Sequence, residues 1–227
     1  MGGGVLFGAI PCKQFQTVLS NSQFITLAKL RLNMEVIRGG GKCECCGKLL
    51  DNLGLHCLSC TRKGGGMWNR HEAICKAILG MCRLPEIPAK SEKRDLIRDS
   101  QERPADVLLL NGKDGKPEAI DVTVVHSCNN SSSSAALRNP EHVLNQAVKR
   151  KQEKYVEKST AEGMLFTVFG LDVYGQLHGD AVHLLERFAS YAAANLGEDY
   201  MGLLKRFKIQ IQVALAKQVC QMIHVRG

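Results

Sequence analysis

The sequence has no long apolar run. No stretch approaches the ~20 residues that a membrane-spanning helix needs, and the opening MGGGVLFGAIPC lacks both a basic start and a long apolar segment for secretion. The chain has no internal repeat and no Tyr-x-Asp-Asp signature of a polymerase. The missing apolar run and secretion signal argue against a membrane or secreted protein, and the expected location is the nucleus, with the cytoplasm as the alternative.

Cysteine, by contrast, is abundant. The chain has ten cysteines in 227 residues, and five of them fall between positions 43 and 60. In a reducing compartment, disulfide bonds explain such a cluster poorly and metal binding explains it better. The cysteine count therefore predicts zinc.

The segment CECCGKLLDNLGLHCLSC, residues 43–60, has the spacing of a structural zinc site. A C-x2-C pair and an H-x3-C pair, nine residues apart, suit tetrahedral coordination. The predicted ligands are Cys43, Cys46, His56 and Cys60. Alternative ligands are the adjacent Cys45 and Cys57, and His71 acting with Cys75 one helical turn later. Four protein ligands leave no open position for water, so this zinc is expected to be structural and not catalytic.

The net charge of +8 favours a polyanionic partner such as DNA. Basic side chains follow the cysteine segment and recur in a later helix. The candidate nucleic-acid contacts are Arg62, Lys63, Arg70, Lys149 and Arg150. Trp68, the only tryptophan, is expected either to stack on a base or to pack on the zinc segment.

The order of periodic segments predicts an α/β layer. Prolines and glycines interrupt these segments, and a serine-rich loop lies near residues 127–140. One or two helices are expected within 14–36, and further helices over 69–82, 139–158, 179–195 and 198–223. Asn69 is the expected cap of the second of these segments, and Pro140 lies in the first turn of the third. Strands are expected on both sides of 111–116 and over 163–175.

The hairpin RPADVLLLNGKDGKPEAIDVTVV, residues 103–125, carries one aspartate in each strand. A turn centred between Lys113 and Asp114 pairs residues whose numbers add to 227, which places Asp106 opposite Asp121. Because strand side chains alternate, both carboxylates then share one face. Facing like charges normally need a cation or a raised pKa, and Mg²⁺ or Mn²⁺ prefers carboxylate oxygens. The alternative is that the aspartates lie on a solvated face.

One lysine lies on an apolar helical stripe after the serine-rich loop. At ~100° per residue, Lys151 shares the arc of Leu144, Val148 and Tyr155. A lysine is seldom buried without a negative partner, so Lys151 is expected to reach the two aspartates; snorkelling along the helix edge is the alternative. Two carboxylates, a metal and a lysine suit phosphodiester hydrolysis, since the metal lowers the pKa of a water and the lysine stabilises developing charge.

The motifs RPAD, IDVTVV and KQEKY resemble the restriction-like endonuclease of site-specific non-long-terminal-repeat retrotransposons, a branch of the PD-(D/E)xK superfamily. The resemblance, over about residues 40–190, implies a restriction-endonuclease-like αβββαβ core and metal-dependent DNA nicking. It assigns metal binding to Asp106 and Asp121. The catalytic lysine would be Lys151, with Lys154 as the alternative, and Arg103 would match the arginine of the first motif.

The sequence departs from the general superfamily pattern at two positions. Ala105 separates Pro104 from Asp106, and Thr123 stands where the superfamily usually has its lysine. The retroelement branch tolerates both departures. The same family carries a CCHC zinc knuckle, and GLHCLSC fits its G-x-H-x3-C pattern, which favours His56 and Cys60.

The resemblance also implies an organisation and partners. The expected segments are an N-terminal helical linker (1–38), a zinc knuckle (39–68), the endonuclease core (69–190) and a C-terminal helical extension (191–227). DNA is the expected substrate, and element RNA is a further expected partner. The chain itself is expected to be part of a larger reverse transcriptase polyprotein. Two other functions remain open: a catalytically inactive, zinc-dependent nucleic-acid-binding module, and a basic protein-interaction domain.

Overall fold

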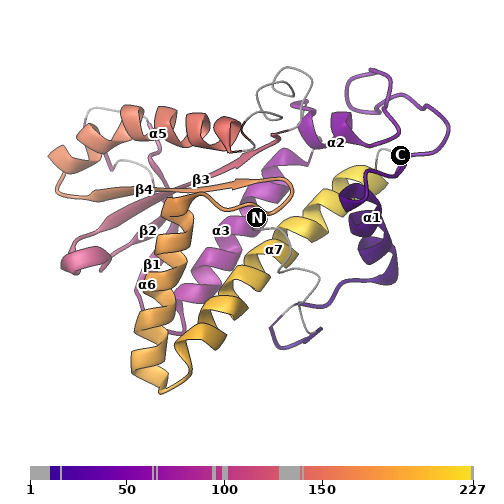
Figure 1. The fold of residues 1–227 in the computed structure, drawn as a ribbon. Coiled ribbons are helices and arrows are strands. Elements are labelled where there is room, and N and C mark those ends of the chain that lie inside the picture. The colour runs from indigo at the N-terminus through magenta and orange to yellow at the C-terminus, as the bar shows by residue number, and fades with distance from the viewer. Residues whose placement is uncertain are drawn as a thin grey trace.

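The computed structural model describes residues 11–15, 17–62, 64, 66–93, 96–98, 102–127, 139 and 141–225. These residues form a mixed α/β structure with a four-stranded mixed sheet and six α-helices (Figure 1). The elements are α1 (Asn21–Arg31), α2 (Leu55–Ser59), α3 (Met67–Cys82), β1 (Ala89–Lys93), β2 (Ala105–Leu109), β3 (Glu118–Val125), α5 (His142–Ala161), β4 (Leu165–Asp172), α6 (Gly179–Leu196) and α7 (Tyr200–His224). The predicted α/β class is confirmed.

The sheet has the order β1-β2-β3-β4. Strands β1, β2 and β3 are antiparallel neighbours, and β4 runs parallel to β3 after the crossover through α5. In the β2–β3 hairpin, Val107 pairs with Ile120, and each observed pair of residue numbers adds to 227. The predicted hairpin register is therefore confirmed, and continued by one residue it places Asp106 opposite Asp121.

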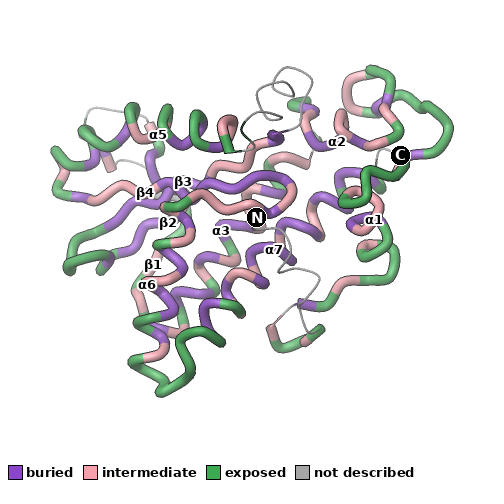
Figure 2. Tube along the Cα trace, viewed as in Figure 1, coloured by how far each residue is buried: buried purple, intermediate pink, exposed green. Residues whose placement is uncertain are grey.

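Helices cover both faces of the sheet (Figure 1). Helix α5 packs on one face, where Leu144 and Val148 meet Val168 of β4. Helices α3 and α6 cover the other face, α7 packs against both of them, and apolar side chains of the three helices contribute to the main core. Figure 2 shows the buried residues along the strands and the facing sides of these helices, whereas the outer side of α5 is exposed. Helix α5 thus projects only its inner stripe, including Lys151, toward the sheet.

The main core joins parts of the chain that are distant in sequence. It contains Leu27 of α1, Cys57 of α2, Ile78 of α3 and Ile223 of α7. The four segments predicted from the sequence therefore contribute to one packed interior, and α7 is a buried part of it. None of the described helices is long and apolar enough to cross a membrane.

Two local predictions differ from the structure. The helix expected within 14–36 is limited to α1, because Ser20 caps its start with a reciprocal Gln23 bond and the chain turns at Asn33. Helix α3 begins at Met67 with Gly66 as its cap, so Asn69 is not the cap. Gly66 has φ of +76°, a conformation that favours glycine.

Strand β1 was not predicted. Its sequence, AKSEK, has no apolar alternation, and it forms the edge of the sheet by pairing with β2. Edge strands often carry charged side chains, because these limit pairing with other chains. A strand of this kind lacks the hydrophobic pattern from which a strand is predicted. Apart from a 3-10 turn at Lys113–Gly115, the described elements from α3 to β4 therefore run helix, strand, strand, strand, helix, strand.

Candidate functional site

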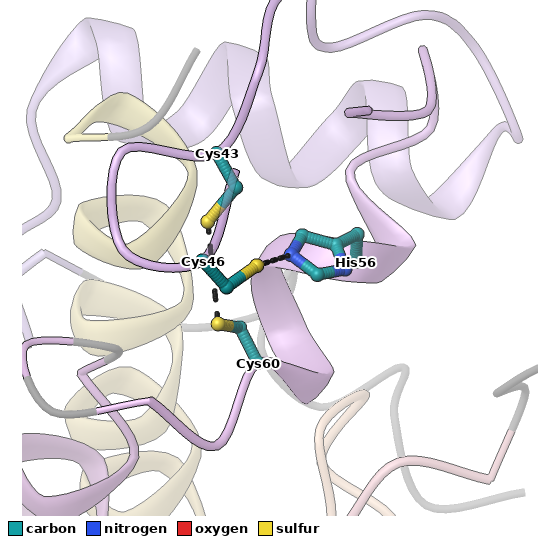
Figure 3. Close-up of side chains that lie close together, drawn as sticks. All are labelled: Cys43, Cys46, His56 and Cys60. Carbon is teal, nitrogen blue, oxygen red and sulfur yellow. Dashed lines mark hydrogen bonds between the residues drawn. The ribbon is translucent and has the colours of Figure 1, made fainter. Parts of the chain in front are cut away.

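Three cysteines and one histidine converge beside α2 (Figure 3). A tight turn follows Cys43, because the N–H groups of Cys46 and Gly47 both donate to its carbonyl. Helix α2 carries His56 and is followed directly by Cys60, and Asp51 accepts the first backbone N–H groups of the helix at 2.8 and 2.7 Å. The turn and the short helix thus present two ligands each.

The donor set and spacing fit a zinc ion. A tetrahedral zinc with bonds of about 2.3 Å holds sulfur atoms about 3.8 Å apart; the Sγ atoms of Cys43 and Cys60 are 4.0 Å apart, and Cys46 Sγ lies 3.2 Å from His56 Nε2. The Cys3His cluster can therefore hold zinc, with these four residues as its ligands.

Electrostatics favour a thiolate in the cluster. Burial raises the pKa of Cys43, but backbone N–H groups and the side chains of His56 and Cys46 outweigh burial and lower it to about 6. Burial raises the pKa of Cys60. A thiolate at Cys43 is the protonation state that binds a metal.

The alternative ligands lie outside this group. Cys57 is fully buried in the main core, and the cluster does not include Cys45. His71 and Cys75 do lie one turn apart on α3, but they meet Asp106 instead of the Cys3His cluster.

The predicted lysine meets one of the predicted aspartates. Lys151 Nζ of α5 lies 2.8 Å from Asp121 Oδ1 of β3. The side chain of Asp121 is 5% exposed and that of Lys151 is 39% exposed. The carboxylate is therefore buried, whereas the lysine that pairs with it is partly accessible to solvent. Thr123 donates its hydroxyl to Asp121 Oδ2 at 3.0 Å. Both oxygens of Asp121 therefore have a donor.

The second aspartate lies at the start of β2, next to a longer neighbouring strand. Asp106 Oδ2 accepts the backbone N–H of Val122 at 2.7 Å, and His71 Nε2 of α3 lies 3.0 Å from the same oxygen. The side chain of Asp106 is 23% exposed. Solvent and small solutes can therefore approach this carboxylate.

The two carboxylates and the histidine influence one another. Burial raises the pKa of Asp121, the Lys151 amine opposes this shift, and the Asp106 charge adds to it. The hydrogen bond with Asp106 raises the pKa of His71 against the effect of burial. Two carboxylates thus share this site with one lysine and one histidine, a setting in which a bound cation would be stabilised.

Two further catalytic candidates take other positions. Lys154 Nζ, the alternative lysine, pairs with Glu102 at 3.0 Å, whereas the amine bound to Asp121 is that of Lys151. Arg103 is exposed three residues before Asp106.

The predicted nucleic-acid contacts divide into exposed and buried residues. Lys149 and Arg150 are exposed on α5, and Arg62 is exposed beyond the cluster. Arg70 is only 2% exposed and donates to the Leu58 carbonyl at 3.2 Å. Burial lowers its pKa to about 10. The prediction that Arg70 contacts nucleic acid is therefore wrong: its guanidinium lies inside the protein.

Other predicted features near these sites have mixed outcomes. Trp68 is 72% exposed, so it does not pack into the cluster. Lys63, Pro140, Cys128 and most of the serine-rich loop lie outside the described residues.

Sequence reasoning missed the role of His71 beside Asp106. The H-x3-C spacing at His71 and Cys75 was visible, and it does put both side chains on one face of α3. The partner on β2 was not visible, because it depends on how α3 packs against the sheet. Comparison with protein-family models matches no family, and comparison with curated proteins gives no significant match.

Proposed function

We propose that this chain is a metal-dependent DNA endonuclease that nicks a phosphodiester bond by hydrolysis. The observation that carries the proposal is the meeting of Lys151 with Asp121 while the charge of Asp106 acts on the same carboxylate. Three residues from β2, β3 and α5 thus form the acid, acid and lysine set that the sequence predicted. Such a set suits phosphoryl transfer, where positioning and electrostatics supply most of the rate.

The order of elements also supports the proposal. The run α3, β1, β2, β3, α5, β4 agrees with the αβββαβ order expected for the restriction-like endonucleases of non-long-terminal-repeat retrotransposons. The resemblance implies a lysine displaced onto the next helix, and Lys151 lies on α5, the helix that follows Asp106 on β2 and Asp121 on β3.

Asp106 and Asp121 would hold a divalent ion, Mg²⁺ or Mn²⁺. When bound, such an ion withdraws charge from phosphoryl oxygens and lowers the pKa of a water molecule. Lys151 supplies a positive charge next to the reacting phosphate and stabilises charge that develops there. Thr123 replaces the usual lysine and holds Asp121 through its hydroxyl, so the carboxylate keeps one orientation.

The exposed basic residues provide a DNA surface. Lys149 and Arg150 lie two residues and one residue before Lys151 on the same helix, and Arg62 follows the Cys3His cluster. Phosphate contacts of this kind position a duplex without reading its sequence. A zinc-bound cluster would brace the neighbouring basic segment. We further propose that the chain binds element RNA, that it belongs to a larger reverse transcriptase polyprotein, and that it acts in the nucleus.

The test is nicking of supercoiled plasmid by zinc-loaded protein, with and without added Mg²⁺. Omission of Mg²⁺ is preferable to a chelator, because a chelator also strips zinc from the Cys3His cluster. We expect Asp121→Asn and Lys151→Met to lower the nicking rate at least about 100-fold. Lys158→Met, an exposed lysine on the same helix that pairs with Glu102, should keep the rate within about threefold.

Two results would reject the endonuclease assignment. Nicking by Asp121→Asn at the rate of the unmodified chain would exclude this carboxylate from the chemistry. Nicking that continues without Mg²⁺ or Mn²⁺ would exclude the metal.

A second candidate function is a zinc-dependent nucleic-acid-binding module without catalysis. The observation that favours it is Thr123 in place of lysine, together with an Asp121 whose oxygens both already have donors. Salt-sensitive DNA binding without a Mg²⁺-dependent product would support this function over the first.

A further inference from the structure

We propose that His71 is a positioning residue that orients Asp106 so that only one of its oxygens, Oδ1, is offered to the divalent ion. This inference rests on the proposed function, because it assigns a role within the same acidic site. It adds a residue from α3 to a set that otherwise comes from β2, β3 and α5.

The hydrogen bonds of Asp106 are all on one oxygen. Oδ2 accepts from the Val122 N–H at 2.7 Å and is 3.0 Å from His71 Nε2. Within the described residues, Oδ1 has no hydrogen-bond partner. A carboxylate held at one oxygen by two donors from different elements cannot rotate freely about its last bond. Its second oxygen therefore keeps a fixed direction, which lowers the entropy lost when an ion binds.

The other ring nitrogen of His71 also has a protein neighbour. Cys75 lies one turn after His71 on α3, and its Sγ is 3.7 Å from His71 Nδ1. Cys75 is 4% exposed and belongs to the main core, so this end of the ring faces packed protein. The side chains of His71 and Asp106 are 33% and 23% exposed, so both are partly accessible to solvent. The ring thus bridges the core and the carboxylate.

His71, Cys75 and Asp106 lie close enough together to hold a metal ion, so the two roles of His71, hydrogen-bond donor and metal ligand, have to be compared. One ring nitrogen is directed at a carboxylate oxygen and the other at a buried thiol. A histidine ligand would direct one nitrogen at the ion and use the other for a supporting bond. Here both nitrogens have protein neighbours, and the open donor atom is Asp106 Oδ1.

The proposal predicts a loss of metal affinity when the donor is removed. Removing a residue that orients a metal ligand typically lowers affinity about 10- to 100-fold. His71→Phe keeps a ring of similar shape and deletes the donor. His71→Gln keeps an N–H near the position of Nε2 but makes a poor metal ligand. The pair therefore separates a positioning role from direct coordination.

The experiment measures Mn²⁺ binding to zinc-loaded protein by electron paramagnetic resonance, with plasmid nicking in parallel. We expect His71→Phe to weaken Mn²⁺ binding about tenfold or more, and His71→Gln to stay within about threefold of the unmodified chain. Lys76→Met, an exposed change on the same helix, should leave binding unchanged. Thermal unfolding of each variant checks that α3 remains folded.

The outcomes separate this inference from the proposed function. If His71→Phe binds Mn²⁺ as well as the unmodified chain, the positioning role is wrong, whatever the nuclease result. If His71→Gln loses as much affinity as His71→Phe while folding normally, the positioning role is again wrong and His71 is a ligand. If the unmodified chain binds no Mn²⁺ that depends on Asp121, the proposed function itself fails.

Discussion

Replacement of Lys151 by methionine tests the electrostatics of the acidic site without requiring any catalysis. Methionine keeps most of the apolar stem and removes the ammonium that lies 2.8 Å from Asp121. The carboxylate, with a side chain only 5% exposed, would then keep Thr123 as a neutral donor and the Asp106 charge as a repulsion. The folded state should therefore be destabilised wherever Asp121 is ionised.

The magnitude follows from burial. Removing one partner of a fully buried ion pair costs about 3–5 kcal/mol. Lys151 is 39% exposed, so water already screens part of this attraction, and the cost of a lost charged hydrogen bond, about 1.5–3 kcal/mol, is the better guide. We expect a loss of about 2 kcal/mol in the free energy of unfolding at about pH 8.

The pH dependence has a definite sign. Burial already raises the pKa of Asp121 in the folded chain, so the folded state holds this proton more tightly than the unfolded state. Stability from such a group falls as the pH rises from the unfolded pKa through the folded pKa. Loss of Lys151 raises the folded pKa further. The loss of stability caused by Lys151→Met should therefore be large at a pH where Asp121 is ionised in the folded state of both proteins. It should shrink toward zero as the pH falls and Asp121 becomes protonated in both.

The assay is urea unfolding, comparing each variant with the unmodified chain at the same pH so that zinc loss at low pH cancels. In an Asp121→Asn background, Lys151→Met should have little effect at any pH, because the buried charge is gone. A penalty that stays constant as the pH is lowered toward the pKa of an ordinary aspartate, or an undiminished penalty in the Asp121→Asn background, would refute the reasoning.

Two further predictions concern the Cys3His cluster and its junction with α3. Cys46→Ala should abolish the binding of one zinc per chain, whereas Cys45→Ala should retain it, as measured by atomic emission of the purified protein. Gly66→Ala should lower stability more than Gly47→Ala, by about 1 kcal/mol or more in urea unfolding. Both glycines have positive φ, but a Cβ at Gly66 would lie 2.7 Å from Met222, whereas one at Gly47 meets no atom within 4 Å.

Those parts of the fold that depend on local pattern could be predicted. The hairpin register followed from the turn at Lys113 and Asp114. Side-chain alternation alone would also allow a strand pairing shifted by two residues, but a turn symmetric about these residues selects the observed pairing. The stripe of Leu144, Val148 and Tyr155 on α5 is buried as its helical spacing predicts. Each of these features is decided within about twenty residues of chain by periodicity and turn chemistry.

Other features depend on contacts between distant segments, and the sequence does not display them. Strand β1 is polar because it forms an edge, so it lacks the alternation that marks a half-buried strand. The bond between His71 and Asp106 joins residues 35 positions apart through helix-on-sheet packing. Likewise, Lys151 and Lys154 share the helix, and only the positions of Asp121 and Glu102 decide which amine meets which carboxylate.

The error at Arg70 shows how the two sites are connected. An arginine beside a basic loop suggests a phosphate contact, but here its guanidinium crosses to the Leu58 carbonyl of α2. Because Leu58 lies between the ligands His56 and Cys60, this bond ties the Cys3His cluster to the first turn of α3. His71 is the next residue, so the arginine that fastens the cluster also fixes the start of the helix that presents His71 to Asp106. A structural zinc can therefore contribute to an acidic site that it does not touch, by holding the helix that supplies one of its hydrogen bonds.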